Sequence, residues 1–578
     1  MRKLTPIATL APWLRLLARR PGRLYLGVLL LALTALSAIG LLALSGWFIT
    51  AAALTGMALA VGIAASLDVY VPGGGIRFFA LSRTVARYME RLYNHDTVLR
   101  LLADLRRRLF AALANQDERI LAQRRSSDWL NRLTADIDAL DSLYLRLLAP
   151  PAVALLVIVV LCGFLALWLP QAGLALLVLL MPAWLWLTAG QAWLGMASSR
   201  RHANHLERLR SHTIEHLTNM SELEAYSTQV WHRQRLRAQE AMLTSDQRRT
   251  GRLASLGTAL ANLVVGVAMV VVLWFAALAW QQQMISGPIL VMMPLAVLAL
   301  SEVLTLLPLP FTRLGATCAA AERLNDVEQQ AGCAVTGTQQ QVFGDAALAI
   351  RLVNVSLRYP GALTSALDSV TLDLAPGARL ALCGVSGAGK SSVAALLARR
   401  ISASQGKVLI DGLPVEQIQE RSLRERVALL GQRIDLFQDS LGGNLRLAEP
   451  EASDARLWQA LEWAELKEWA VGLPAGLETP VGEGGSQLSS GQARRVALAR
   501  LWLRNPGLVI LDEPFAGLDS ATLVRLKPKL DSWLDGRSVI YLVHQLDGGI
   551  FDPPGVSLVG RLVGGRLQDC AKPEYLSG

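Results

Sequence analysis

The sequence predicts a membrane-spanning α-helical bundle fused to an α/β domain that carries a phosphate-binding loop. Two patterns predict this fold class. The N-terminal half of the 578 residues contains six long apolar stretches, whereas short β-branched runs alternate with helical patterns from about residue 346 onward. The composition agrees, because 52% hydrophobic and only 18% charged residues is typical of a chain with several membrane spans. The chain is also about twice as long as one hydrophobic core usually supports, so at least two domains are expected.

The positive charge is unevenly distributed along the chain. The net charge is +10, and nearly all of the excess lies in the first 345 residues. Connections between apolar stretches alternate in character: "RLLADLRRRLF" and "QRRTGR" are rich in arginine, whereas "WLPQAG" and "WQQQMISG" contain no Lys or Arg. Membrane proteins keep their basic loops in the cytoplasm. The asymmetry therefore predicts that both termini are cytoplasmic, and it argues against nucleic acid as the partner of the basic residues.

Four segments are expected in order along the chain. Arginines interrupt "WLRLLARRPGR", so residues 1–20 are expected to form an amphipathic helix on the cytoplasmic membrane surface rather than a signal peptide. A six-helix transmembrane domain is expected over 21–320, a polar linker over 321–345 and the α/β domain over 346–578. The six spans are expected near residues 24–46, 50–76, 146–168, 172–194, 256–280 and 287–309.

The second domain contains a phosphate-binding loop. The segment "GVSGAGKSS", residues 384–392, matches G-x-x-x-x-G-K-[ST] between an apolar strand and a helical segment. Its glycines let backbone N–H groups approach phosphate oxygens, and the helix N-terminus adds a partial positive charge. Lys390 is expected to reach the β- and γ-phosphates, and the Ser391 hydroxyl to ligate Mg²⁺. The nucleotide-contacting residues expected here are Gly384, Ser386, Gly387, Ala388, Gly389, Lys390, Ser391 and Ser392.

Two carboxylates follow a second apolar strand. The segment "LVILDEP", residues 508–514, ends in Asp512 and Glu513. Asp512 is placed to hold Mg²⁺ through water, and Glu513 is placed to polarise an attacking water as a general base. Two adjacent acids at a strand end are weak evidence alone, but with a phosphate-binding loop upstream they predict nucleotide hydrolysis.

A third motif resembles the signature of the ABC transporters. The segment "LSSGQARRVALAR", residues 488–500, is similar to their LSGGQ motif. The resemblance implies that Ser489 and Gly491 contact the γ-phosphate of a nucleotide bound by a second subunit, so two halves must dimerise. Six spans fused to one nucleotide-binding domain resemble half of a type IV ABC exporter.

Further landmarks of that family are present. The resemblance implies that Tyr359 in "LRYP" stacks on adenine and that Gln432 in "LLGQR" is the Q-loop residue, which senses Mg²⁺ and contacts the membrane domain. It also implies that Asp519 in "AGLD" is the D-loop residue and that His544 in "YLVHQ" is the switch histidine, which contacts the γ-phosphate.

The chain departs from the family pattern at a few positions. Ser490 stands where the signature normally has glycine, "AGLD" replaces the frequent S-A-L-D, and "VHQ" replaces T-H-R. Ser490 adds a hydroxymethyl group where the backbone packs close to phosphate. Because Lys390, Glu513 and His544 are intact, we expect the chain to bind and hydrolyse ATP with these three as catalytic residues, unequally between its two composite sites.

Two segments of the membrane half indicate a narrower group. "IGLLALSGWFITAAALTG", residues 39–56, and "GGGIRFFALSRTVARYMERLYNHD", residues 73–96, resemble the CydC-type subunits of the CydDC transporters. The resemblance implies a heterodimer with a CydD-like subunit in the bacterial inner membrane, needed for the assembly of cytochrome bd and c-type cytochromes. It implies cysteine and glutathione, or haem b, as the small molecule that is handled.

Charged residues near the second span are candidates for cargo contact. Arg91 and His95 are spaced i and i+4, so they share one helix face. Imidazole is a common haem-iron ligand and arginine suits a propionate, and the resemblance implies that this histidine binds haem. Alternatively, His95 caps a helix turn or pairs with Asp96, and Arg91 extends to lipid headgroups. Glu302 is a second candidate, because ionisable groups within spans are usually functional or paired.

Two other functions stay open. The cargo could be a lipid, peptide or drug, although arginines at 77, 83, 87 and 91 favour an anionic one. The chain could also be a regulatory ATP-binding membrane subunit that moves nothing, against which the intact Glu513 argues. Transport direction does not follow from the sequence, because a nucleotide switch can power either direction.

Overall fold

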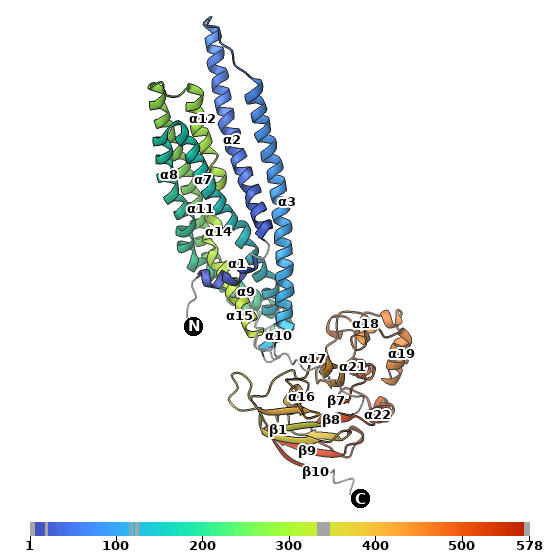
Figure 1. Ribbon diagram of the computed structural model, residues 1–578. Helices are drawn as coiled ribbons and strands as arrows, with labels where there is room; N and C mark the ends of the chain where they lie inside the picture. The colour runs from blue at the N-terminus through green and yellow to red at the C-terminus, as the bar shows by residue number, and fades with distance from the viewer. Residues whose placement is uncertain are drawn as a thin grey trace. The chain divides into compact units, whose positions relative to one another are not determined.

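The computed structural model divides into two compact units (Figure 1). It describes residues 6–17, 21–114, 116, 120–121, 126–331 and 347–571. The first unit comprises Met1–Asn115 and Arg124–Gly332, and the second comprises Gln116–Gln123 and Cys333–Gly578. Each unit is described by itself below.

The described residues of the first unit form helices joined by short turns, with no β-strand among them. Five helices or continuous helical runs are long and apolar enough to cross a bilayer: Pro21–Ala60, Asp128–Trp168, Pro170–Thr218, Gln229–Gln281 and Gly287–Thr312. A sixth long helix, α3, has 45 residues, but its arginines lower its hydropathy. The α-helices are α1 (Pro6–Leu17), α2 (Pro21–Ala60), α3 (Tyr70–Ala114), α5 (Ser126–Asn131), α6 (Ile137–Ser142), α7 (Ala149–Trp168), α8 (Pro170–Leu185), α9 (Gln191–Thr218), α10 (Met220–Ala225), α11 (Gln229–Gln281), α12 (Gly287–Leu298), α13 (Ser301–Leu304), α14 (Pro308–Thr312) and α15 (Leu314–Ala331).

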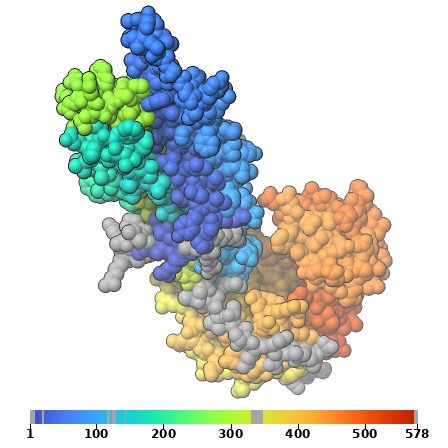
Figure 2. Space-filling view, turned by 45° about the horizontal axis from the view of Figure 1, so that its top comes forward, coloured from blue at the N-terminus to red at the C-terminus, as the bar shows by residue number. Residues whose placement is uncertain are grey.

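The expected bounds of the second span are wrong. Residues 50–60 continue α2, the chain turns over 61–69, and the next helix is α3. Residues 47–49, which separate the first two expected spans, contain no proline or cluster of turn residues that would end a helix. The break comes instead at Gly62, whose φ is +82°, and Asp68 Oδ1 then accepts the backbone N–H of Tyr70 at 2.8 Å, which caps α3. Helices α2 and α3 lie side by side along their length (Figure 2).

Small residues let the membrane helices approach closely. Along α11 a buried stripe recurs every three or four residues and packs into the core with α7, α8 and α12: Ala261, Val265, Ala268, Val272 and Ala276. A Cβ on Gly195 of α9 would lie 2.2 Å from the carbonyl oxygen of Thr312 in α14. Since lipid tails are as apolar as these side chains, such close packing is a main source of helix association in a membrane.

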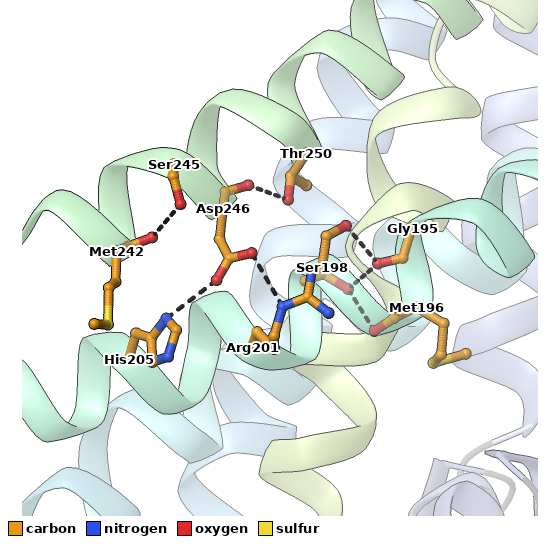
Figure 3. Close-up of polar contacts among 10 residues, drawn as sticks. Gly195, Met196, Ser198, Arg201, His205, Met242, Ser245, Asp246 and Thr250 are labelled. Atoms are coloured by element: carbon orange, nitrogen blue, oxygen red, sulfur yellow. Dashed lines mark hydrogen bonds and ion pairs between the residues drawn. The ribbon is translucent and has the colours of Figure 1, made fainter. Parts of the chain in front are cut away.

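A buried carboxylate joins α9 to α11 (Figure 3). Asp246 of α11 is 7% exposed, and its Oδ1 accepts a hydrogen bond from Arg201 Nε at 3.2 Å. Its Oδ2 lies 3.1 Å from His205 Nδ1, and both partners belong to α9. One turn further along α11, Thr250 Oγ1 donates to the Asp246 carbonyl at 2.8 Å. Because a buried carboxylate is costly unless it is paired, this cluster favours one register between the two helices.

The first and last helices of the unit pack together. The buried side chains of α1, Leu10, Trp13 and Leu17, belong to one hydrophobic cluster with residues of α3 and α15. The apolar face expected to lie on a membrane surface is therefore covered by protein. Helix α15 runs to Ala331, so the residues expected to begin a linker at 321 are helical, and 332–345 lie outside the described residues.

The second unit contains a parallel sheet, as its alternating pattern predicted. The six-stranded sheet has the order β10-β9-β3-β8-β7-β6, in which only β10 is antiparallel to its neighbour. A four-stranded antiparallel sheet has the order β2-β1-β4-β5. The strands are β1 (Ile350–Leu357), β2 (Leu367–Leu374), β3 (Arg379–Cys383), β4 (Gln405–Ile410), β5 (Leu413–Pro414), β6 (Val427–Leu430), β7 (Leu508–Asp512), β8 (Ser538–Val543), β9 (Leu558–Val563) and β10 (Arg566–Ala571).

The helices of the second unit connect these strands. The α-helices are α16 (Lys390–Leu397), α17 (Glu420–Arg426), α18 (Leu441–Arg446), α19 (Asp454–Trp463), α20 (Lys467–Val471), α21 (Ser490–Arg504) and α22 (Ser520–Leu534). Every residue of β3 and β7 is buried, and Leu511 pairs with Tyr541 across β7 and β8. Because the strands are parallel, the carboxyl ends of β3, β8 and β7 meet at one edge of the sheet, where ligands usually bind in open α/β folds.

Candidate nucleotide-binding site

The phosphate-binding loop joins β3 to α16 and requires glycine at three positions. Gly387 and Gly389 have φ values of +83° and +104°, which side-chain-bearing residues rarely adopt. A Cβ on Gly389 would lie 2.5 Å from the carbonyl oxygen of Ala366, and one on Gly384 would lie 2.6 Å from that of Leu562. The same glycines that expose backbone N–H groups therefore also let the loop pack against neighbouring strands. Ser386 and Ala388, two other residues expected to contact nucleotide, lie on either side of Gly387 in this loop.

Lys390 lies over the loop that precedes it. The side chain is 7% exposed, and its Nζ donates hydrogen bonds to the carbonyl oxygens of Gly384 at 2.5 Å and Val385 at 3.2 Å. In phosphate-binding loops of this kind the lysine binds the β- and γ-phosphates. The ammonium group is thus already positioned at the centre of the loop.

The two expected Mg²⁺ ligands from β7 and α16 lie in direct contact. Ser391 Oγ donates a hydrogen bond to Asp512 Oδ2 at 3.0 Å. Burial raises the pKa of the Asp512 carboxyl, and the charge of Glu513 raises it further, whereas the Ser391 hydrogen bond and Lys390 oppose this. A hydroxyl and a carboxylate at this spacing are oxygen ligands of the kind that Mg²⁺ prefers. The two groups come together because β3 and β7 flank β8.

Glu513 and His544 form a pair at the same edge. Glu513 Oε1 lies 2.8 Å from His544 Nε2. Glu513 has a φ of +46°, which is uncommon for a residue with a side chain, and its backbone N–H donates to the Leu542 carbonyl of β8 at 3.0 Å. The Gly384 N–H in turn donates to the His544 carbonyl at 3.2 Å. The loop, the acid and the histidine are therefore joined through the ends of β3, β7 and β8.

Tyr359 and Gln432 lie at the margin of this group. Tyr359 is 36% exposed, and its hydroxyl lies 3.2 Å from Ser392 Oγ, so the ring stands over the start of α16. Gln432 follows β6 and is exposed. Its side chain forms no hydrogen bond with Ser391 or Asp512 in the described part of the chain. Its backbone carbonyl accepts a hydrogen bond from Arg494 Nη2 at 2.7 Å.

The signature segment begins α21 with a capping box. Ser489 Oγ accepts from the Gln492 N–H at 3.2 Å, and Gln492 Oε1 accepts from the Ser489 N–H at 2.9 Å. A Cβ on Gly491 would lie 2.6 Å from the Gly517 carbonyl oxygen. Conversely, a Cβ on Gly517 would lie 3.1 Å from the Ser490 hydroxyl. Two of the departures from the family pattern, Ser490 and Gly517, therefore face each other, and the added hydroxymethyl group is matched by a missing methyl.

Asp519 caps the next helix. Its Oδ1 accepts the Thr522 backbone N–H at 2.8 Å and its Oδ2 accepts the Thr522 hydroxyl at 2.8 Å. These hydrogen bonds lower the pKa of the Asp519 carboxyl. The D-loop residue is thus held in place at the N-terminus of α22.

Arg494 is a site residue that the sequence argument missed. It is 5% exposed, and its guanidinium donates to the carbonyl oxygens of Gln432 at 2.7 Å, Asp512 at 3.0 Å and Glu513 at 3.1 Å. One side chain therefore ties the signature helix to the acidic strand end and to the segment after β6. The helical spacing of buried Gly491, Arg494, Leu498 and Leu501 was a signal that could have placed it on the inner face.

The charged candidates of the first unit are all on α3 or α13. Arg91 and His95 are exposed on α3. The expected alternative of a His95–Asp96 pair is not formed, because Asp96 accepts hydrogen bonds from Arg23 at 2.6 Å and Arg100 at 3.0 Å. Glu302 of α13 pairs with two arginines of α3, which are discussed below.

Comparisons with known proteins identify the family. Residues 28–302 match the family described as the ABC transporter transmembrane region, and residues 367–516 match the family described as ABC transporter. The glutathione/L-cysteine transport system ATP-binding/permease protein CydC of Escherichia coli K12 is 34% identical to this chain, over 93% of each sequence. The chain belongs to the ABC transporter family. The resemblance seen in the signature motif is therefore confirmed over nearly the whole length of this ABC transporter.

Two further relatives of the ABC transporter define its fold and type. The CydD protein of the same-named transport system in Bacillus subtilis 168 is 29% identical, over 93% of this chain and 92% of that protein. A solved bacterial Atm1-family ABC exporter with ATP bound superposes with a TM-score of 0.83 at 20% identity, covering 96% of both chains. The predicted fold class is thus confirmed. The chain is a CydC-like half of a multi-pass, ATP-hydrolysing transporter that uses ATP with Mg²⁺.

Proposed function

We propose that this half-transporter pairs with a CydD-like subunit in a bacterial inner membrane and uses ATP to move glutathione or cysteine. The observation that carries the proposal is the likeness, over 93% of both chains, to a protein named for glutathione and L-cysteine transport. The distribution of charge supports the orientation of the chain in the membrane. The connection at 61–69 contains no Lys or Arg, whereas α9 is basic toward its C-terminal end and α11 toward its N-terminal end. Both termini and the second unit then lie in the cytoplasm.

The geometry of the nucleotide site supports the following roles. The loop from Gly384 to Gly389 and Lys390 hold the phosphates, while Ser391 and Asp512, with Gln432, hold Mg²⁺. Glu513 polarises the attacking water, and His544, 2.8 Å away, orients it and contacts the γ-phosphate. Tyr359 stacks on adenine.

The signature segment supports the need for a partner. Ser489 is exposed at the N-terminus of α21, where backbone N–H groups and the helix dipole suit an anion. Ser489, Gly491 and Asp519 therefore act on a nucleotide whose phosphates are held by the second subunit. A lone chain has only half of each composite site.

The test is transport by the purified pair reconstituted in liposomes, with labelled glutathione and ATP. Glu513→Gln is expected to lower ATP hydrolysis at this chain's site by about a hundredfold or more, because general-base catalysis typically contributes that much, and to lower transport with it. Glu451→Gln, which removes the same charge from an exposed position of this unit, should leave both rates unchanged. Unchanged transport in Glu513→Gln, or no ATP-dependent movement of either thiol by the wild type, would contradict the proposal.

Haem is a second candidate cargo. His95 and Arg91 are exposed on one face of α3, and Asp96, the neighbour that could have taken the imidazole, is occupied by two arginines. We expect the purified pair to give a Soret band with added haem b, and His95→Ala to weaken it, because imidazole is a common axial ligand. A Soret band of the same intensity and position in His95→Ala would remove this assignment.

A further inference from the structure

One carboxylate and two guanidinium groups meet inside the membrane half. Glu302 lies on α13, within the span Gly287–Thr312, and Arg83 and Arg87 lie one turn apart on α3. Arg83 Nη2 donates to Glu302 Oε1, and Arg87 Nη2 donates to Glu302 Oε2 at 3.3 Å. Each carboxylate oxygen therefore has its own arginine, and the triad carries a net charge of +1.

The triad is accessible rather than sealed. The side chains of Arg83, Arg87 and Glu302 are 26%, 42% and 43% exposed. Three charges facing lipid would be very unfavourable, so this face of α3 must line a hydrated space or a subunit interface. The opposite face packs on α2, where the Ser82 and Ser37 hydroxyls lie 3.1 Å apart.

The backbone around Glu302 is irregular, which is a second and independent observation. The sixth span is divided into α12, α13 and α14, with short turns between them. Backbone N–H groups of Leu300, Glu302 and Val303 donate to the third residue before them instead of the fourth. Irregular backbone within a membrane is tolerated where it is buried in protein or lines a water-filled cavity, and broken helices often carry the substrate site of a transporter.

We propose that Arg83 and Arg87 bind a carboxylate group of the cargo and that Glu302 is their resident counterion, which the cargo displaces. Two guanidinium groups without a carboxylate partner would be unfavourable in free energy in this environment, whereas exchanging one carboxylate for another keeps both of them paired. Binding and release then differ little in electrostatic energy, which suits a site that must give up its cargo. Arg83 Nε is buried and forms no hydrogen bond in the described part of the chain, so Nη2 is the group of Arg83 that is directed at Glu302.

The inference rests on the proposed function only in taking a carboxylate-bearing thiol, such as glutathione, as the cargo. Arginine forms paired hydrogen bonds with carboxylates, and hydrogen bonds to charged groups are among the stronger ones. The exposed Arg91 lies one turn beyond Arg87 on α3 and extends the basic surface.

The test is equilibrium binding of labelled glutathione to the purified pair. Arg83→Gln and Arg87→Gln are each expected to raise the Kd about tenfold, and Glu302→Gln to lower it because the competing carboxylate is gone. Arg107→Gln removes the same charge from an exposed position of the same helix and should change the Kd by less than about twofold. Glu302→Asp keeps the carboxylate and should bind as the wild type does.

A ligand-side arm needs no variant. Glutathione diethyl ester, whose two carboxylates are blocked, should bind the wild type about tenfold or more weakly than glutathione. S-methylglutathione, which keeps both carboxylates, is the second ligand. The inference would be overturned by equal binding of the ester and the acid, by a raised Kd in Glu302→Gln, or by the absence of saturable binding of glutathione and S-methylglutathione. If both ligands bind in a manner that depends on the triad but neither is moved by ATP, the proposed function fails while the inference stands.

Discussion

Arg494 connects the strand ends that form the nucleotide site. Its guanidinium contacts carbonyl oxygens of Gln432, Asp512 and Glu513, which come from two different strand ends. Glu513 has an unusual positive φ, and a neighbouring donor helps to hold that conformation. The position of the proposed general base is therefore linked to the signature helix through a single side chain.

Replacing Arg494 should damage both stability and catalysis. Arg494→Ala leaves three carbonyl oxygens without this donor, so the free energy of unfolding is expected to fall by about 2–4 kcal/mol and ATP turnover to fall at least tenfold. Thermal unfolding and ATP hydrolysis of the purified pair measure the two effects. Arg433→Ala, whose side chain is 94% exposed, is the matched control and should lie within about 0.5 kcal/mol of the wild type. ATP turnover equal to that of the control would show that Arg494 does not position the site.

Residues in contiguous motifs could be predicted from the sequence, whereas residues that depend on packing could not. Gly384–Ser392 and the Asp512–Glu513 pair stand at strand ends that a parallel sheet must bring together. The helical spacing of Arg494 with Gly491, Leu498 and Leu501 marks it as the inward-facing one of the Arg494–Arg495 pair. Its acceptors could not be predicted, because Gln432, Asp512 and Glu513 come from segments that only the packing brings together. Ser490 and Gly517 belong to two motifs that are separate in sequence, so the sequence alone did not show that the two substitutions compensate for each other.

At the scale of elements, Glu465 connects α19 with α21 and α22. It follows α19, its carboxylate pairs with Arg525 at 2.9 Å and Lys529 at 2.5 Å of α22, and its carbonyl accepts from Arg495 of α21 at 2.6 Å. Burial alone would raise the pKa of Glu465, but the two ion pairs outweigh burial and lower it. The stabilisation is therefore present above the ordinary glutamate pKa and is lost as the pH falls from that value through the lowered one.

Glu465→Gln should accordingly show a pH-dependent loss of stability. The variant is expected to unfold at a lower temperature than the wild type near neutral pH, and the difference should shrink as the pH falls below the ordinary glutamate pKa. Thermal unfolding over a pH series measures this. Glu468→Gln, an exposed glutamate on α20, should show no such trend. A difference that grows toward acid pH would contradict the assignment.

The packing of α1 gives a second prediction about an element. Trp13 is 3% exposed, and its Nε1 is buried without a hydrogen-bond partner among the described residues. Trp13→Ala should lower the free energy of unfolding by about 3–5 kcal/mol, whereas Trp13→Phe should cost much less because it keeps an aromatic ring and removes an unsatisfied N–H. Thermal unfolding in detergent separates the two, with exposed Arg15→Ala as the control. Equal, small effects of both Trp13 variants would indicate that α1 lies on lipid instead.

The elements that could be predicted were those with clear breaks in the sequence. The apolar stretches 146–168, 256–280 and 287–309 end at polar or turn-forming residues, and their helices were expected nearly where they occur. The second span was misplaced because residues 24–65 are almost continuously apolar, so composition alone does not show where the helix ends. The cap made by Asp68 and the positive φ of Gly62 decide it.

The whole molecule is half of an ATP-hydrolysing transporter, and its nucleotide site and its membrane helices belong to different units. The shift from an apolar, basic half to a near-neutral α/β half predicted this division, because the first half is suited to lipid and the second to water. The exposed signature serine and the absence of any second signature motif in the sequence explain why a single chain is incomplete.

ATP turnover of the purified chain, measured alone and together with the proposed CydD-like partner, tests this account most directly. We expect the lone chain to hydrolyse ATP at about one hundredth of the rate of the pair, or more slowly still. The reason is that each composite site needs a signature segment from the other subunit. A monomeric chain that turns over ATP as fast as the pair would contradict the account.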